Sequence, residues 1–222
     1  MPAAGPVRVV PLRDACLTLA GGHARLHRRD SAPREVAQQA SAVAWDGKEI
    51  LIAARGRVYF LDEQGSPLRS VEAAPSVAAL AHDGRHLVMG FDEGNVLVSP
   101  ATGGQAISLQ DIAPSPVTAL HLGPAPETVV VGFANGFLGI WSLRNGARLE
   151  QAQLHGAVTH LVAQQARIHL ASELGDHTTL DLDVLREPYC SLMREVWAQV
   201  PVVWQHGLAV VQPAPADHAC RK

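Results

Sequence analysis

The chain has 222 residues and a mass of 23.6 kDa, a length that permits one domain or two. Apolar residues make up 47% and charged residues 18%, which excludes an intrinsically disordered chain. The formal net charge is -3, so the chain lacks the basic field that nucleic acids and anionic membranes attract. We therefore expect neither of them as a partner.

Five short apolar runs of similar pattern follow one another, at 6–10, 41–45, 76–80, 116–120 and 157–161. Their second residues, spaced 35, 35, 40 and 41 apart, are Val7, Ala42, Val77, Val117 and Val158. Periods of about 20–50 residues are typical of solenoids and propellers, in which each repeat is one supersecondary unit. We interpret the chain as five such units, at about 6–40, 41–75, 76–115, 116–156 and 157–185.

Each unit continues with a second apolar run, a turn that contains glycine, and a third run. The turn glycines are Gly22, Gly56, Gly94, Gly136 and Gly175. Glycine adopts the positive φ of tight hairpin turns at little cost, and short alternating or wholly apolar runs predict strands rather than helices. Three units carry a further turn and a weaker fourth run, so we expect each unit to be a four-stranded antiparallel meander.

Meanders of about forty residues are typical of β-propeller blades, and ring closure protects the edges of the sheets. We predict an all-β fold for residues 1–185: a small β-propeller of about five four-stranded blades, with a sixth blade possible. Another possibility is an incomplete propeller that closes only by oligomerising.

Residues 81–103 and 129–146 resemble WD-repeat blades, and the resemblance is clearest over 81–146. Trp141 falls where that family has the Trp of its terminal dipeptide, with Ser142 in place of the usual Asp. His155 and Gly156 reverse the family's Gly-His pair, and its Asp-His-Ser/Thr-Trp tetrad cannot be assembled from the sequence. Because members of this family usually act as scaffolds, the resemblance implies a protein-interaction module.

The repeat pattern ends near residue 186, and residues 186–222 are predicted to form a helix, a closing hairpin and a tail. An apolar stripe at helical spacing predicts an amphipathic helix, and it consists of Tyr189, Leu192, Met193, Val196, Trp197 and Val200. This helix is expected either to lie on the propeller as a lid or to dock a partner. The hairpin is expected to complete the last blade or to close the ring. The candidate partner-binding residues are Met193, Trp197 and Trp204.

Signatures of catalysis are absent from the sequence, which contains no GxSxG, HExxH, GxxxxGK or GxGxxG motif. We therefore expect no catalytic residue and no cofactor. A possible zinc-type donor set consists of Cys190, His206, His218 and Cys220. The spacing of these residues along the chain is poor for a zinc site, so no metal is expected. The alternative function is a propeller enzyme or small-ligand binder with a site at the mouth of the central channel. Possible contributors to that site are Asp83, Asp92 and His121.

A local basic patch lies in the first unit and comprises His23, Arg25, His27, Arg28, Arg29 and Arg34. It is interpreted as a solvated strand edge, the alternative being a site for an acidic partner or a phosphate group. Three cysteines are too few for a disulfide framework, and the first twenty residues do not read as a signal peptide. Taken together, these features predict a cytoplasmic protein-interaction module or scaffold subunit with a protein partner.

Overall fold

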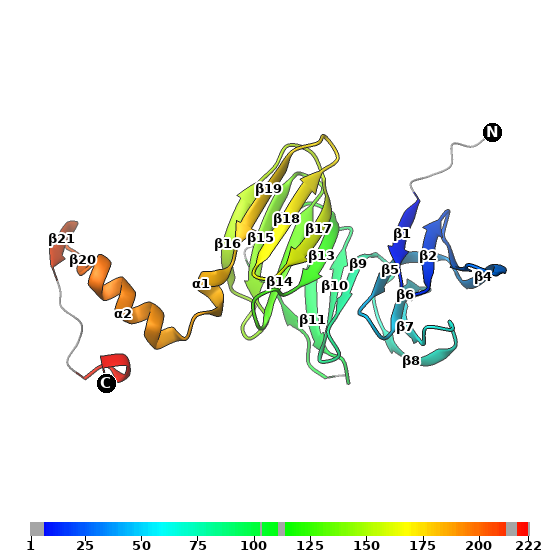
Figure 1. Ribbon diagram of the computed structural model, residues 1–222, viewed down its shortest axis with the longest axis horizontal. Helices are drawn as coiled ribbons and strands as arrows, with labels where there is room; N and C mark the ends of the chain where they lie inside the picture. The colour runs from blue at the N-terminus through cyan, green and yellow to red at the C-terminus, as the bar shows by residue number, and fades with distance from the viewer. Residues whose placement is uncertain (1–6, 103, 111–113, 212–216, 222) are drawn as a thin grey trace.

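The computed structural model describes residues 7–221, except for 103, 111–113 and 212–216. Five antiparallel sheets follow one another along the chain, and an arm that contains a helix extends from the last of them (Figure 1). We call the sheets the first to fifth blades. In each blade the order of the strands in the sheet follows their order in the chain. The predicted all-β fold with five blades is confirmed.

The strands have the following bounds. The first blade contains β1 (Arg8–Pro11), β2 (Ala15–Ala20), β3 (His23–Arg28) and β4 (Ser31–Gln38). The second contains β5 (Ala40–Trp45), β6 (Ile50–Ala54), β7 (Arg57–Leu61) and β8 (Pro67–Glu72). The third contains β9 (Val77–His82), β10 (His86–Phe91), β11 (Val96–Pro100) and β12 (Ile107–Ser108). The fourth contains β13 (Val117–Leu122), β14 (Thr128–Phe133), β15 (Phe137–Ser142) and β16 (Arg148–Gln153). The fifth contains β17 (Val158–Gln164), β18 (Arg167–Ser172) and β19 (His177–Asp181), so the fourth strand expected for this blade is missing from the described chain.

The core lies between consecutive blades. Strand β5 packs against β9, β9 against β13, and β13 against β17, so the first strands of the blades line the centre of the fold. Strands β6 and β14 are buried along their whole length, because a neighbouring blade covers each face of the sheet. This burial on both faces explains why these strands read as continuous apolar runs instead of alternating patterns.

Two glycines allow neighbouring blades to approach closely. A Cβ atom added to Gly90 would lie 2.4 Å from Cγ1 of Val117 in the next blade. In the same way, a Cβ atom on Gly132 would lie 2.5 Å from Cγ1 of Val158. The hydroxyl of Thr118 adds a polar link, because it donates a 2.6 Å hydrogen bond to the carbonyl of Val158. The fourth and fifth blades are therefore joined by packing and by a hydrogen bond.

The repeat position at the start of each unit shows that the ring is open. Ala42, Val77, Val117 and Val158 are each at most 2% exposed, whereas Val7 is 56% exposed because no blade of the described chain covers its outer side. Among the described strands, no packing of β17 on β1 corresponds to that of β5 on β9. The first and fifth blades lie at opposite ends of the body in Figure 1.

Both end faces of this open arc are mostly polar, and each exposes one valine, Val9 or Val162. On the first blade, Thr18 and His27 form a 2.8 Å hydrogen bond, and His23 pairs with Glu35 at 2.8 Å. Thr18 follows the buried Leu17, so its side chain points to the opposite face of the sheet. The free face of the fifth blade is also polar, with an ion pair between Arg167 and Asp181 and a hydrogen bond between His169 and Thr179. The arc is thus bounded by polar faces, as terminal repeats require for solubility.

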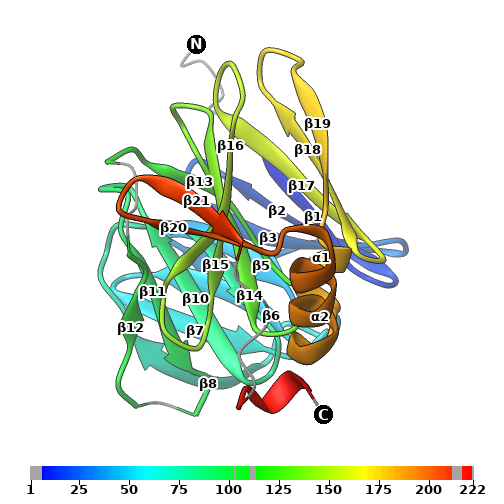
Figure 2. The same cartoon turned by 90° about the vertical axis from the view of Figure 1, so that its left-hand side faces the viewer.

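The C-terminal arm corrects two expectations about residues 186–222. It follows α1 (Asp183–Arg186) and contains α2 (Tyr189–Gln199), β20 (Val202–Gln205), β21 (Leu208–Val211) and the short 3₁₀ helix η1 (Ala219–Arg221). The predicted helix is confirmed, but it contains no buried residue and extends away from the blades, so it is not a lid (Figure 1). Figure 2 views the molecule from the side of this arm, with α2 and the strands β20 and β21 in front of the blades. The hairpin of β20 and β21 forms a separate two-stranded sheet. It neither completes the fifth blade nor closes the ring, and the predicted role of the hairpin was wrong.

Candidate functional site

The first strands of three blades end around one cavity at the mouth of the central channel. Its volume is about 520 Å³. The cavity is lined by the ends of β5, β9 and β13, from Val43 to Asp46, from Leu80 to Asp83 and from Leu120 to Leu122. Arg8 and Val10 of β1 complete the lining. Equivalent positions of successive repeats therefore build this site.

Two Asp-Gly turns shape the rim of the cavity. Oδ1 of Asp46 accepts hydrogen bonds from the backbone N–H groups of Lys48 (2.7 Å) and Glu49 (2.6 Å). Asp83 repeats this arrangement with the backbone N–H groups of Arg85 (2.8 Å) and His86 (2.7 Å). The glycine after each aspartate adopts a positive φ, +94° for Gly47 and +86° for Gly84. These turns hold both carboxylates in place.

A buried Asp–His pair links the second and third blades at this mouth. Nδ1 of His82 donates a 2.5 Å hydrogen bond to Oδ2 of Asp46, and the two side chains are only 2% and 6% exposed. Burial raises the pKa of Asp46, but the hydrogen bonds from Glu49, His82 and Lys48 lower it below its usual range. The pair is thus a structural connection within the channel.

Asp46, Glu49 and His82 also bring three potential metal-ligand atoms within 4.8 Å of one another. Each carboxylate already has a protein partner, because Glu49 accepts a 2.6 Å hydrogen bond from Arg69 and Asp46 pairs with His82. Arg69 also lies over the ring of Phe60, 3.8 Å from its centroid, and Phe60 contacts His82 edge to face. This packing assigns the three residues to a structural network.

Two of the three residues proposed for the channel mouth lie there. Asp83 and His121 line the cavity, whereas Asp92 is exposed in the turn after β10. Because β10 runs antiparallel to β9, its last residue lies at the opposite end of the sheet from Asp83. The structure therefore places Asp92 away from the site.

Arg8 was not among the residues proposed for the channel mouth, yet it lines the cavity together with His121. Among the described residues, the half-buried side chain of Arg8 makes no hydrogen bond or ion pair, and burial lowers the pKa of its guanidinium. Nδ1 of His121 is buried without a hydrogen-bond partner. Burial also lowers the pKa of His121, so its ring is neutral at pH 7.

The basic patch of the first blade is largely paired. Arg28 donates a 2.5 Å hydrogen bond to the carbonyl of Glu63 in the second blade, and Arg34 donates to the carbonyl of Gln64. His23 and His27 bond within their own sheet, to Glu35 and Thr18. These contacts favour a structural role over phosphate binding and agree with the interpretation as a strand edge.

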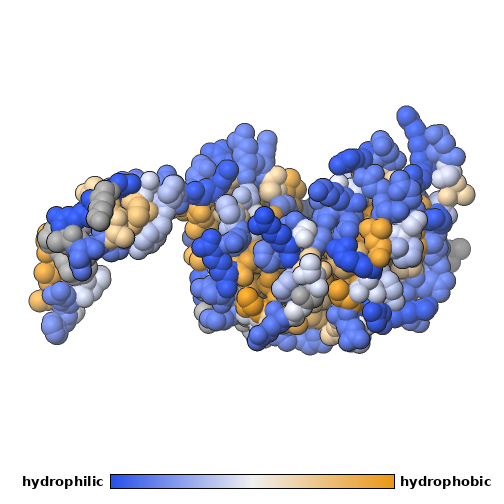
Figure 3. Space-filling model, turned by 90° about the horizontal axis from the view of Figure 1, so that it is seen from below, coloured by the Kyte–Doolittle hydropathy of each residue, from blue (hydrophilic) through white to orange (hydrophobic). Residues whose placement is uncertain are grey.

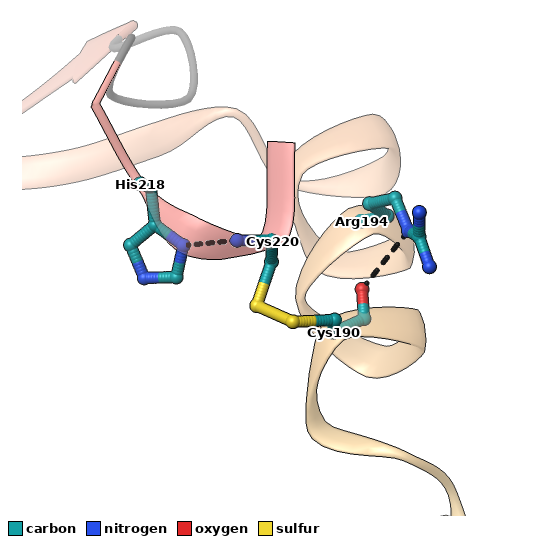
Figure 4. The surroundings of a disulfide bond; sticks show 4 residues. All are labelled: Cys190, Arg194, His218 and Cys220. Atoms are coloured by element: carbon teal, nitrogen blue, oxygen red, sulfur yellow. Dashed lines mark hydrogen bonds between the residues drawn. A yellow bond between two sulfur atoms is a disulfide. The ribbon is translucent and has the colours of Figure 1, made fainter. Parts of the chain in front are cut away.

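A disulfide joins the two ends of the arm (Figure 4). Cys190 in α2 and Cys220 in η1 have an S–S distance of 2.07 Å, and His218 accepts a 3.2 Å hydrogen bond from the backbone N–H of Cys220. The ring of His218 contacts Trp197 edge to face, with ring centroids 5.0 Å apart. Cys190 and Cys220 therefore cannot act as the thiolate ligands of the zinc-type donor set considered above, because the disulfide uses both sulfur atoms.

The three candidate partner-binding residues differ in their exposure. Met193 and Trp197 are half-buried on the helix face that the chain's own C-terminal segment covers. Trp204, in contrast, is 78% exposed on the hairpin. The side chains of Val202 and Val211 lie on the same face of the hairpin as Trp204 and extend this apolar surface, at 42% and 71% exposed. Figure 3 shows apolar groups on the arm, which stands clear of the body.

Two features of the WD-repeat resemblance have clear structural roles. Trp141 is fully buried, and its indole N–H donates a 2.7 Å hydrogen bond to the carbonyl of Gln110. In the fifth blade, Nδ1 of His155 bonds Oδ2 of Asp176 at 2.6 Å. This Asp–His contact was missed from the sequence, because Asp176 lies 21 residues beyond His155.

No protein-family model matches the chain, and no curated protein matches it significantly. Known structures nevertheless share its fold. The computationally designed protein Ika8 is 22% identical, with a TM-score of 0.62 over 79% of this chain and 58% of that one. The WD40 β-propeller domain of Doa1 is 17% identical, with a TM-score of 0.62 over 81% of this chain and 66% of that one. A chain of the mitotic checkpoint complex is also 17% identical, with a TM-score of 0.58 over 82% of this chain and 71% of that one.

These similarities show the fold alone. The chain has the fold of a WD-repeat-like β-propeller, as the resemblance of residues 81–146 predicted. It spans 58% of the length of Ika8 and 66% of the Doa1 domain. Within the described residues, every helix is too short or too polar to cross a lipid bilayer.

Proposed function

We propose that this protein is a non-catalytic protein-interaction module or scaffold subunit, with its contact surface on the C-terminal arm. The exposure of Trp204, Val202 and Val211 on one face of a hairpin that projects from the body carries this proposal. An isolated two-stranded hairpin is marginally stable in water, so covering it with a partner stabilises both. The propeller fold supports the proposal by analogy, since one similar chain belongs to a multiprotein assembly.

Affinity isolation with the full-length chain tests this function. Trp204→Ser is compared with Leu149→Ser, which removes an exposed apolar side chain from β16 in the fourth blade. We expect a stoichiometric protein partner that Trp204→Ser weakens by about tenfold or more, as for a central interface Trp, and that Leu149→Ser retains. Met193→Ala and Trp197→Ala extend the test to the helix. Recovery of no stoichiometric partner, or full retention of the partner by Trp204→Ser, would contradict the proposal.

The cysteine pairing bears on the compartment. A cytoplasmic location was expected from the cysteine count, yet disulfides are rare in the reducing cytosol. Differential thiol alkylation of acid-quenched cells distinguishes the protein with a Cys190–Cys220 disulfide from the protein with reduced cysteines. Alkylation of all three cysteines would support the cytoplasm, whereas a protected pair at Cys190 and Cys220 beside a free Cys16 would place the protein in an oxidising compartment.

The channel mouth supports a second candidate function, the binding of a small ligand. The observation that favours it is a cavity of about 520 Å³ in which the half-buried side chain of Arg8 has no partner in the described chain. Concave sites with apolar walls and a few convergent polar groups are typical of ligand pockets.

A further inference from the structure

The wall of the cavity at the channel mouth is about half apolar and half polar. Its apolar residues are Val10, Val43, Trp45, Leu80, Leu120 and Leu122. A volume of about 520 Å³ accommodates a ring or a branched chain with one polar group attached. The charged and polar side chains around the wall decide which polar group fits.

The two carboxylates of the cavity are already satisfied. Asp46 accepts two backbone hydrogen bonds through Oδ1 and one from His82 through Oδ2. Asp83 accepts two backbone hydrogen bonds through Oδ1, and its Oδ2 lies 3.2 Å from Nδ1 of His86. A bound cation would have to compete with these existing donors, so the carboxylates do not define a cation site.

Unlike the two carboxylates, the side chain of Arg8 has no partner in the described chain. Its guanidinium remains charged at every accessible pH, is half-buried, and finds no acceptor among the described residues. An uncompensated charge at a partly buried position costs free energy, which a bound anion recovers. His121, from the fourth blade, lines the same cavity, but its Nδ1 atom is buried and does not face a ligand there.

We infer that the channel mouth binds a carboxylate attached to an apolar body. Arg8 pairs with the carboxylate in the planar geometry that guanidinium groups favour. Trp45, Leu120 and Leu122 cover the apolar body. This inference rests on the second candidate function and is independent of the arm.

Calorimetric titration of the full-length protein with three probes of the same apolar body tests the inference. The probes are 3-phenylpropionate, its neutral amide and 3-phenylpropylamine. We expect the carboxylate to bind about tenfold or more tightly than the other two. Equal binding of carboxylate and amide would overturn the anion preference while leaving a ligand site, and tighter binding of the amine would also overturn it. Binding of none of the probes would contradict both the inference and the second candidate function.

Variants locate the binding site. Arg8→Gln should abolish the preference for the carboxylate over the amide, and Arg8→Lys should retain part of it. Arg25→Gln is the matched control, because Arg25 is exposed on β3 and does not line the cavity. Unchanged carboxylate preference in a folded Arg8→Gln protein would overturn the assignment to Arg8. The probe series on the unmodified protein remains decisive if this variant does not fold.

Free acids and protein chains both carry such carboxylates, and one more probe distinguishes them. The peptide Gly-Gly-Phe presents its C-terminal carboxylate beside an aromatic ring, as 3-phenylpropionate does, but adds a peptide chain. Tighter binding of this peptide would identify a protein carboxylate as the source. Tighter binding of the free acid would identify a small molecule.

Discussion

Asp46 at the rim of β5 accepts a 2.5 Å hydrogen bond from His82 at the end of β9, so this carboxylate joins the second blade to the third. We predict that Asp46→Asn lowers the free energy of unfolding by about 1–3 kcal/mol at pH 7, the usual value for a hydrogen bond to a charged group. Chemical denaturation measures this loss. Asp92→Asn is the control and should have little effect, because Asp92 is exposed and makes no side-chain hydrogen bond in the described chain.

The same carboxylate predicts a dependence on pH. Hydrogen bonds hold the pKa of Asp46 below its usual value in the folded state, so its stabilising contribution is present above about pH 4 and is lost as pH falls further. The difference in stability between the wild-type protein and Asp46→Asn should therefore narrow between pH 5 and pH 3. A difference of the same size at both ends would show that the charge of Asp46 does not contribute.

Gly139 lies against the indole of Trp141, and an added Cβ atom would come within 2.3 Å of the ring. We predict that Gly139→Ala destabilises the protein by about 1–3 kcal/mol, as overpacking of a core does. In a Trp141→Leu background the same substitution should cost much less, because the ring that it meets is gone. Urea denaturation of the four proteins in this double-mutant cycle measures the coupling. Additive effects would exclude the proposed contact.

The close approach of Gly132 to Val158 predicts local unfolding. Gly132→Ala should separate the fifth blade from the fourth and increase hydrogen exchange in β17, β18 and β19. The second blade should keep its protection, because each blade contacts only its neighbours. Val158→Ala in the same chain removes both methyl groups but keeps the Cβ atom, 2.6 Å from the added one, so it should restore only part of the protection. An increase spread evenly over all blades would contradict this local effect.

The disulfide of the arm should act on the arm alone. Replacing Cys190 and Cys220 by serine is expected to increase proteolysis between α2 and η1 without a measurable shift in the melting temperature of the blades. The reason is that α2 packs on η1 and buries no residue against the sheets. Cys16→Ser serves as the control for cysteine replacement, since Cys16 is unpaired. A large fall in the melting temperature would show that the arm supports the blades.

The polar end faces predict that the isolated protein is a monomer of 23.6 kDa. The ion pair of Arg167 with Asp181 and the bond between His23 and Glu35 satisfy these faces without a second copy. Light scattering after size-exclusion chromatography measures the mass. A stable dimer that persists in Trp204→Ser would indicate that the end faces, and not the arm, join two chains.

The repeat and the burial of its apolar positions could be predicted from the sequence, because both depend on the pattern of residues close together in the chain. The spacing of Val77, Val117 and Val158 identifies successive blades, and each of these residues is buried as its pattern requires. The openness of the ring is not local. It depends on the angle between blades, and in the structure it appears first in the exposure of Val7.

The candidate sites were less predictable for two physical reasons. An amphipathic stripe shows that one face of a helix is covered but not by what, and here the cover is the chain's own segment around His218. The cavity gathers Arg8 and His121 from the first and fourth blades, a pairing that follows only from the curvature of the arc. The prediction that Asp92 contributes to the channel mouth was wrong, because β10 runs antiparallel to β9 and ends at the opposite edge of the blade.

An open arc also tolerates changes in repeat number that a closed ring does not. In a ring, one additional blade alters the angle at every interface, whereas here a duplicated blade is accommodated at an end, where Val7 or the free face of β17–β19 meets solvent. The interface between Gly132 and Val158 would remain unchanged by such an addition. Gain or loss of a whole blade at either end is therefore a route by which this chain can vary in length while the packing of its interior blades stays the same.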